Sequence, residues 1–411
     1  MSAATRLLLL VLVCQPVSSW AAPYSGGQGT PQAPFLISTA EDFKAIGENP
    51  ADWDKTFKLT QNIDLSGYDE TKLRMIGRWK ALGSWDNQPF RGIFDGNGKT
   101  IANFRYLNLR EEYVGLFQHV TGDIKNLTLL RPTVMGDQLG TGALVGYLEK
   151  GSIRDCAVRE ADVSGYYGVG GLVGVAHSSV HRSWSHGVVS GVRYVGGLVG
   201  QVYGTVALSC SKARVIGEES VGGLAGAMMG VGSIVDSSYA RGEVKGKVYV
   251  GGLVGQVEAG RVYQCYATGK VSGTQSVGGL VGYQRALAQV MASLWDTQSS
   301  TQATSVGGTG KTTAEMKAVD TFWSMNWDFT EVWTICEGIN YPVLLWQIPL
   351  ADLDCPDGVS FIDFALLAAN WRSRNCRNAN RYCSGADLDR SGAVDLRDLA
   401  LFAGDWLAGT E

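Results

Sequence analysis

The chain of 411 residues has a formal net charge of −4, and only 18% of its residues are charged. No basic patch or polybasic stretch is evident, so the sequence predicts no nucleic-acid partner. Glycine occurs 54 times, roughly double its usual share. This density excludes a fold of long helices and favours short strands joined by tight corners.

The N-terminal segment predicts export. Arg6 is followed by the apolar run Leu7–Val13 and then by small residues up to Ala22. This order is typical of a signal peptide, and the apolar run is too short to span a bilayer. We therefore predict a signal peptide over residues 1–22, a secreted or cell-surface location, and no membrane span in the mature protein.

Residues 23–112 are predicted to form an N-terminal cap and the first coils of the repeat array that follows. A capping-box start at Ser38 or Thr39 and an apolar face extending to Ile46 predict a short helix. An uncovered end of a repeat array exposes unpaired strands, so we expect this helix to close the first coil.

A short glycine-rich segment then recurs at nearly constant spacing. One copy reads Val169-Gly-Gly-Leu-Val-Gly174, and each copy has a leucine at the same place. These repeat leucines are Leu144, Leu172, Leu198, Leu224, Leu253 and Leu280. They recur about every 27 residues, and a period of this length indicates stacked supersecondary units. The runs between glycines are short and β-branched or aromatic, which indicates strands.

The repeat predicts a mainly β fold, a parallel β-helix or β-solenoid over residues 113–297. One coil has room for three short strands and three corners, and stacked coils about 4.8 Å apart bury their apolar faces together. We expect the Leu and Val side chains to form inner ladders and the glycines to form corners. An antiparallel β-propeller is the alternative, although about 27 residues is short for a blade. Residues 298–349, rich in aromatic side chains from Thr321 to Leu345, are predicted to form a C-terminal cap.

The repeat resembles the GLUG motif of secreted and surface-attached bacterial proteins. The resemblance begins at a divergent copy, Tyr113-Val-Gly-Leu-Phe117. Flanking stretches similar to the same family are Tyr24–Thr30, Asn62–Ser66, Phe94–Ile101, Gly310–Lys317 and Tyr341–Leu344. The resemblance implies a structural or adhesive extracellular role. Some members also have a metallopeptidase domain, but its His-Glu-x-x-His motif does not occur in this sequence.

Seven cysteines lie beyond the predicted signal peptide. Cys156, Cys210 and Cys265 each follow a repeat leucine at the same offset in the sequence. Alternate coils are about 9.6 Å apart, twice the coil spacing, so we expect these three thiols to be buried and reduced. The other four, which export allows to form disulfides, are Cys336, Cys355, Cys376 and Cys383. Cys376–Cys383 is a plausible pair, but the sequence leaves the connectivity open.

After Pro349, aspartates gather into two segments of equal length. In the segment Asp387–Asp398, oxygen-bearing side chains occupy positions 1, 3, 5, 9 and 12, with glycine at position 6. This is the EF-hand calcium-loop pattern with Asp at position 12, and a backbone carbonyl supplies the ligand at position 7. The predicted calcium ligands are Asp387, Asp389, Ser391, Ala393, Asp395 and Asp398.

The segment Asp352–Asp363 repeats this pattern less regularly. Pro356 occupies position 5, and the acidic residue is displaced to position 6 as Asp357. The predicted ligands here are Asp352, Asp354, Asp357, Ser360 and Asp363. Acidic turns without an ion remain the alternative for both segments. A helix is expected after each loop, over Phe364–Trp371 and Leu399–Leu407.

The duplicated loop and helix of residues 351–408 resemble the dockerin domain, and in particular the dockerin-like tails of exported bacterial proteins. The resemblance implies two calcium sites and docking onto a cohesin-type partner. We therefore interpret the chain as an exported scaffold or adhesion protein for which no catalytic residue is predicted.

The alternative is a secreted protein that binds or degrades polysaccharide, since parallel β-helices often have such activities. Tyrosines on the coils could stack on sugar rings or could form aromatic ladders that only stabilise the solenoid. These are Tyr166, Tyr167, Tyr194, Tyr203 and Tyr249. Three nearby histidines, His177, His181 and His186, are a further candidate site for zinc or copper.

Overall fold

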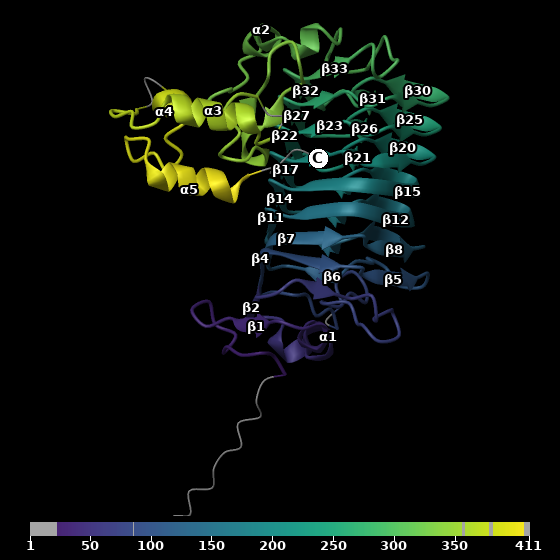
Figure 1. Cartoon of the computed structure of the whole chain (residues 1–411). Coiled ribbons are helices and arrows are strands. Elements are labelled where there is room, and N and C mark those ends of the chain that lie inside the picture. The colour runs from purple at the N-terminus through teal and green to yellow at the C-terminus, as the bar shows by residue number, and fades with distance from the viewer. Residues whose placement is uncertain (1–22, 85, 356–357, 378–380, 407–411) are drawn as a thin grey trace, which may run out of the picture.

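The computed structural model describes residues 23–84, 86–355, 358–377 and 381–406, so the predicted signal peptide lies outside the described residues. The chain winds into a tall parallel β-solenoid, and a small helical module projects from its side near the C-terminal end (Figure 1). The mainly β solenoid predicted from the glycine-rich repeat is therefore confirmed.

One face of the solenoid is a parallel sheet with one strand from each of seven consecutive coils. Its strands are β6 (Phe117–Val120), β10 (Val145–Leu148), β13 (Val173–Ala176), β16 (Val199–Val202), β21 (Ala225–Met228), β26 (Val254–Val257) and β31 (Val281–Gln284). The motif valines pair with one another across coils, as Val173 does with Val199. This parallel register excludes the antiparallel β-propeller.

The other strands of the coils form one continuous sheet that follows the bends of the coil, whereas β35 (Trp333–Thr334) and β36 (Val343–Leu344), after the coils, pair only with each other. The N-terminal coils contribute β1 (Phe35–Ile37), β2 (Thr56–Leu59), β3 (Ile63–Asp64), β4 (Ile93–Ala102), β5 (Arg105–Asn108), β7 (Asp123–Leu130), β8 (Thr133–Gly136) and β9 (Leu139–Gly142). The middle coils contribute β11 (Ser152–Arg154), β12 (Ala157–Gly170), β14 (Ser179–His181), β15 (Trp184–Gly196), β17 (Thr205–Ala207), β18 (Cys210–Ser211), β19 (Arg214–Ile216) and β20 (Glu219–Gly222).

The last coils show the repeat unit most clearly. Their strands are β22 (Ile234–Asp236), β23 (Tyr239–Ala240), β24 (Val244–Lys245), β25 (Val248–Gly251), β27 (Arg261–Tyr263), β28 (Tyr266–Ala267), β29 (Val271–Ser272), β30 (Gln275–Gly278), β32 (Gln289–Met291), β33 (Leu294–Asp296) and β34 (Thr309–Lys311). The coil from β25 to β29 thus has five short strand segments. The expectation of three strands and three corners per coil is wrong, because additional bends divide the coil into more and shorter strands.

The repeat leucines form an inner ladder. Leu172, Leu198, Leu224, Leu253 and Leu280 are fully buried, and Leu144 is 1% exposed. The motif valines Val173 and Val199 are equally buried beside them. Each coil therefore depends on its neighbours for burial, as in other repeat proteins.

The motif glycines are needed for close approach between backbones. A Cβ on Gly196 would lie 2.0 Å from the Val199 carbonyl oxygen and 2.5 Å from the Gly226 nitrogen, and Gly222 is equally enclosed. Neither glycine has the positive φ of a left-handed corner. Such corners fall instead on Tyr194, Ser220 and Tyr249, each directly before a repeat valine. The second motif glycine of each coil, such as Gly197, lies in the bend between the two sheets, so the expected corner role is confirmed for that glycine, whereas Gly196 and Gly222 end strands.

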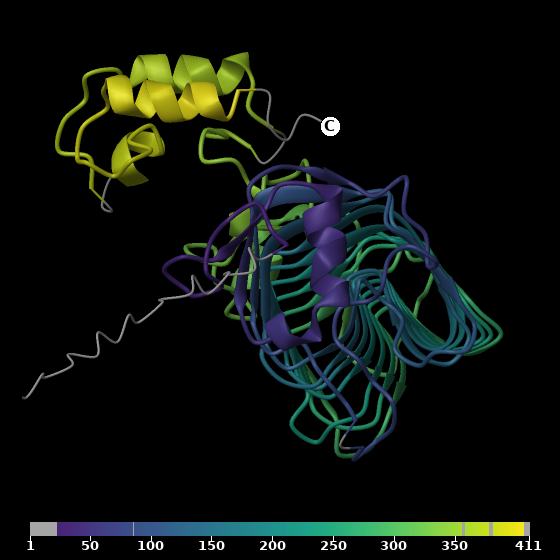
Figure 2. The same ribbon diagram turned by 90° about the horizontal axis from the view of Figure 1, so that it is seen from below.

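A helix closes the N-terminal end of the solenoid, as expected. Helix α1 (Ala40–Glu48) begins after Thr39, whose side chain and that of Asp42 form a reciprocal capping box. It is followed by a 3₁₀ turn, η1 (Pro50–Asp52). Phe43 and Ile46 are buried beneath the helix, which lies across the end of the coil in Figure 2.

The segment after the last coil first extends the solenoid and then folds back along its side. Strand β34 pairs with β33 and continues the parallel sheet. The elements that follow are η2 (Glu315–Lys317), α2 (Val319–Trp323), β35 (Trp333–Thr334), β36 (Val343–Leu344) and η3 (Leu345–Gln347). Trp327 and Trp333 pack against Tyr266 on the outer face of the coils. We call residues 313–349 the lateral cap.

The three solenoid cysteines are buried and free, as predicted. Cys156 and Cys265 belong to an inner ladder in which serine occupies the other coils, and the amide of Cys265 donates to the Ser293 hydroxyl at 3.1 Å. Cys210 instead pairs in register with Trp184 and contacts the lateral cap. The common offset from the repeat leucines was misleading because the coils differ in length.

Candidate calcium sites and docking face

In its described residues, the C-terminal module has three helical segments around a small core. They are α3 (Phe361–Ala369), α4 (Arg381–Ser384) and α5 (Leu396–Gly404). Val359, Leu367, Val394 and Phe402 are buried between them. Helices α3 and α5 lie side by side in Figures 1 and 2.

Both main helices begin three residues earlier than predicted, inside the acidic loops. Ser360 and Asp395, at position 9 of their loops, are the N-caps. The Ser360 hydroxyl accepts a hydrogen bond from the Ile362 amide at 3.1 Å, and the Asp395 carboxylate accepts one from the Arg397 amide at 2.8 Å. In each loop the aspartate at position 12 completes a capping box. Capping therefore fixes the last predicted ligand relative to the loop.

Three carboxylates converge in the second loop. Oxygen atoms of Asp387, Asp389 and Asp398 all lie within 4.8 Å of one another. The Asp398 carboxylate accepts hydrogen bonds from the Asp389 amide at 3.1 Å and the Asp395 amide at 2.8 Å. The Asp387 carboxylate accepts from the Gly392 amide at 2.9 Å. The loop is thus closed around its own aspartates.

The first loop forms a matching cluster despite its irregular spacing. Oxygen atoms of Asp352, Asp354 and Asp363 lie within the same 4.8 Å limit. The Asp363 carboxylate accepts from the Leu353 amide at 2.6 Å and from the Ser360 amide at 2.7 Å. Asp357, predicted as a ligand, lies outside the described residues.

The predicted ligands are therefore brought together in part. In both loops the carboxylates at positions 1, 3 and 12 converge. Ser360 and Asp395 cap helices, and the Ser391 hydroxyl donates to the Ala393 carbonyl oxygen at 3.2 Å. Within the described ranges, no other group of three acidic, His or Cys side chains converges, and His177, His181 and His186 do not lie together as such a group.

The environment of the carboxylates differs within each cluster. Burial raises the pKa of Asp387, although amide groups of Gly392 and Ser391 donate to it. Hydrogen bonds from Ser391 lower the pKa of the exposed Asp389. Burial also opposes ionisation of Asp363, but backbone amides outweigh it and lower that pKa.

These clusters fit a divalent cation. Asp363 and Asp398 are fully buried and Asp387 is 2% exposed. Burying neighbouring carboxylates is unfavourable unless an opposite charge compensates them. Carboxylate oxygens are the hard ligands that calcium takes, and three of them would supply part of its six to eight positions. The remaining coordination positions of each loop would come from water or from other oxygen atoms of the loop.

One disulfide lies within the C-terminal module, and another joins the module to the lateral cap. Cys376 and Cys383 are bonded, with their Cα atoms 5.0 Å apart, as the sequence suggested. The other bond joins Cys336 of the lateral cap to Cys355 in the first acidic loop, with Cα atoms 5.1 Å apart. The sequence left this second pair open, and it ties the module covalently to the solenoid.

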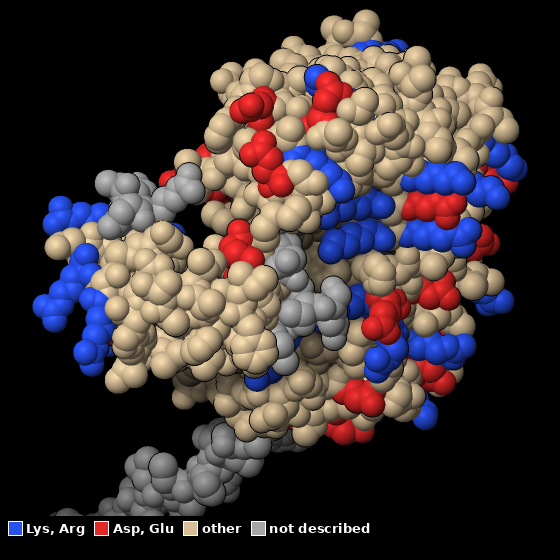
Figure 3. Space-filling model, turned by 45° about the horizontal axis from the view of Figure 1, so that its top comes forward, with Lys and Arg blue, Asp and Glu red and all other residues tan. Residues whose placement is uncertain are grey.

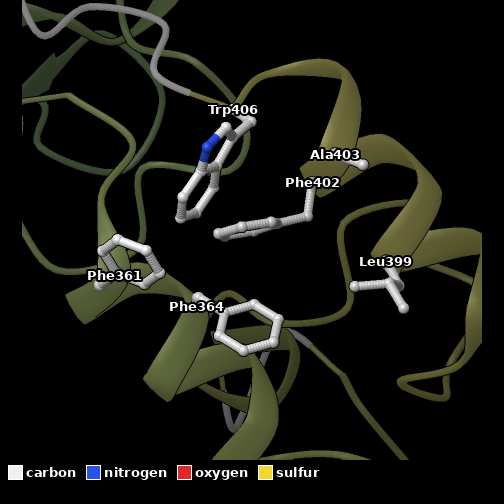
Figure 4. Close-up of a pocket in the computed structure, with 6 residues that line it drawn as sticks. All are labelled: Phe361, Phe364, Leu399, Phe402, Ala403 and Trp406. Carbon is white, nitrogen blue, oxygen red and sulfur yellow. The ribbon is translucent and has the colours of Figure 1, made fainter.

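An apolar groove runs between α3 and α5. Its volume is about 340 Å³, and Figure 4 shows the rings that line it. Phe361, Phe364, Leu399, Phe402, Ala403 and Trp406 form the lining. Phe361 is 78% exposed at the mouth of the groove. Sequence reasoning missed this surface, although Phe361 and Phe364 lie three residues apart, the spacing of one helix face.

Several coil carboxylates pair with cations on neighbouring coils. Arg193 contacts Glu219 at 2.6 Å, Arg214 contacts Glu243 at 3.0 Å, and Arg285 contacts Glu258 at 2.8 Å. Figure 3 shows acidic and basic side chains interleaved on this outer surface. Exposed pairs of this kind add about 0–1 kcal/mol each, and here they link successive coils.

Most of the tyrosines considered for sugar binding have a ring partner. Tyr203 stacks on His177 with centroids 4.1 Å apart, and the edge of Tyr194 meets Tyr167 at 4.8 Å. Tyr166 is the most exposed, at 51%. The stacked rings run between coils, so these contacts favour the ladder interpretation over a sugar platform.

Comparisons with known proteins support the repeat. Residues 246–272 match the GLUG motif. The chain is 32% identical over 155 residues to "Halomucin" of Haloquadratum walsbyi, covering 37% of this chain and 2% of that protein. It is 34% identical over 128 residues to a "Putative Gly-rich membrane protein" of Evansella cellulosilytica, covering 30% of this chain and 14% of that protein. The chain therefore spans only a small part of these relatives.

One solved structure has the same fold. A crystal structure described as a "putative immunoglobulin A1 protease" from Bacteroides ovatus superposes with a TM-score of 0.51 and 23% identity. The match covers 79% of this chain and 95% of that one. At this identity the likeness shows the solenoid architecture alone. Among the described residues, no helix is both long and apolar enough to cross a bilayer.

Proposed function

We propose that this chain is an exported scaffold or adhesion protein, located outside the cell or on its surface. The β-solenoid presents a long, rigid surface, and a calcium-binding, dockerin-like tail attaches it to a partner. The observation that supports this function most directly is the pair of matching carboxylate clusters in the two acidic loops. A single acidic turn is common, whereas two loops with the same capping box and the same convergent positions indicate a duplicated binding element.

Calcium would act as a structural ion in this tail. Asp387, Asp389 and Asp398 would bind one ion, and Asp352, Asp354 and Asp363 would bind the other. Because each position-12 carboxylate also caps its helix, binding would stabilise the start of α3 and α5. The same helices line the apolar groove, so the ions would also order the candidate docking face toward a cohesin-type partner.

Calcium binding is testable by isothermal titration of the full chain, freed of bound ions with EDTA. We expect two calcium ions per chain. In the Asp398→Asn variant the stoichiometry should fall to one calcium ion per chain. Asn keeps a neutral oxygen at this position but lacks the negative charge that balances the cation. Asp162→Asn, an exposed carboxylate on the solenoid, is the matched control and should bind two. Titration showing no calcium binding to the unaltered chain would refute the calcium sites.

Docking and catalysis need separate tests. The exposed Phe361 ring lines the groove, so we expect the Phe361→Ser variant to lose calcium-dependent binding of the partner. The same variant should still bind two calcium ions. The scaffold proposal predicts no new reducing ends or unsaturated sugars when the protein is incubated with a panel of polysaccharides. Appearance of either product would favour the polysaccharide-degrading alternative.

A further inference from the structure

A second, larger cleft lies where the C-terminal module meets the lateral cap. Its volume is about 1130 Å³, so it could enclose a segment of chain and not only a small molecule. One wall comes from the cap, from Val319 to Glu337, and the other from the module, including Leu353 and Tyr382. The cleft is distinct from the apolar groove between α3 and α5.

The cleft is acidic. Five carboxylates line it against a single guanidinium, that of Arg390. Asp352 and Asp387 belong to the proposed calcium sites, but Asp328, Glu331 and Glu337 belong to the cap. In the described part of the chain none of these three cap carboxylates forms an ion pair. An excess of negative charge therefore remains in the cleft even when the loops bind calcium.

Aromatic surface accompanies this charge. Trp323 is 56% exposed on the cap side, and Phe329 and Tyr382 also line the cleft. The Arg390 guanidinium lies over the Tyr382 ring, 5.0 Å from its centroid. The cleft thus already shows the contact that a guanidinium makes with an aromatic face.

A covalent bond fixes the two walls relative to each other. Cys336 follows the cap segment that contains Glu331, and its disulfide partner Cys355 lies two residues beyond Leu353 of the module wall. This bond therefore limits how far the two walls of the cleft can move apart.

We propose that this cleft binds an arginine-bearing peptide segment of a partner protein. Arginine is the side chain that both pairs with carboxylates and stacks on aromatic rings, and a lysine ammonium stacks less well. Several arginines spaced along an extended segment would meet the cap carboxylates in turn. This inference goes beyond the calcium-dependent docking proposed above and does not rest on it.

The probe is a fluorescein-labelled nonapeptide with four arginines separated by Gly and Ser, measured by fluorescence anisotropy against the full chain in calcium-containing buffer. A peptide with citrulline in place of each arginine keeps the shape and removes the charge. We expect the arginine peptide to bind more tightly than the citrulline peptide and to weaken as salt is added. Equal binding of the two peptides, or tighter binding of a neutral oligosaccharide, would overturn the proposal.

Variants locate the binding in the cleft. Replacing both Glu331 and Glu337 by Gln should weaken binding about tenfold, and Trp323→Ala should weaken it about fivefold. Glu243→Gln, on the coil surface, should leave it unchanged. Replacing Cys336 and Cys355 together by Ser should also weaken binding, because the walls are no longer tied. Unchanged affinity in the two glutamate-to-glutamine replacements, in a protein with an unaltered circular dichroism spectrum, refutes the site.

Discussion

Replacing one rung of the inner leucine ladder tests the solenoid packing directly. Leu224 is fully buried between Leu198 and Leu253 of the adjacent coils. Leu224→Ala removes the side chain's burial and leaves a cavity that the neighbouring coils can fill only in part. Buried Leu-to-Ala changes cost about 3–5 kcal/mol. We expect a value of about 3 kcal/mol here, because flanking leucines can shift slightly.

Because each coil contacts only its neighbours, the effect should be local. Native-state hydrogen exchange measures it as the free energy of opening of each strand. At about 1.4 kcal/mol per factor of ten, amides of β20, β21 and β26 should exchange about 100-fold faster, whereas those of β4 and β7 change little. Leu287→Ala, at a side chain that is 85% exposed, is the control. Equal exchange in the two variants, or uniform loss of protection along the solenoid, would refute this account.

Three further predictions address the glycines, the serine ladder and the thiols. Gly222→Ala should lower the urea midpoint strongly because the added methyl meets the backbone, whereas Gly232→Ala, where nothing lies within 4 Å, should not. Ser238→Ala should lower the free energy of unfolding by about 1–3 kcal/mol, since the Ser238 hydroxyl accepts a hydrogen bond from the Ser209 amide at 3.1 Å. Ser238→Cys should lower it less, because Cys265 occupies the equivalent place in the next coil. Equal melting temperatures of the two variants would contradict this prediction. Burial raises the pKa of Cys156 from 9.0 to about 12, so its contribution to stability is complete below pH 9 and is lost as the pH rises toward 12. The midpoint of urea unfolding should fall over that range more in the unaltered protein than in Cys156→Ser, and parallel curves would contradict the assignment.

The acidic loops were predictable because the ligands of each loop lie close together in the sequence. Asp387, Asp389 and Asp398 converge as the spacing indicated, and local turns and a capping box suffice to bring them together. The predicted helix starts were three residues late, because Ser360 and Asp395 match the ligand pattern of the loop. In the structure these two residues are the N-caps of α3 and α5.

The repeat alone determined the solenoid, since a leucine that recurs about every 27 residues can be buried only if successive coils stack in register. Only the tertiary structure decided what depends on contacts between distant segments. The function of the motif glycines follows from the distance between adjacent backbones, and the place of Cys210 follows from coil length. The Cys336–Cys355 bond and the acidic cleft arise because the lateral cap folds back along the solenoid. No local pattern encodes that return, because it is set by burial of Trp327 and Trp333 against tyrosines that lie much earlier in the chain.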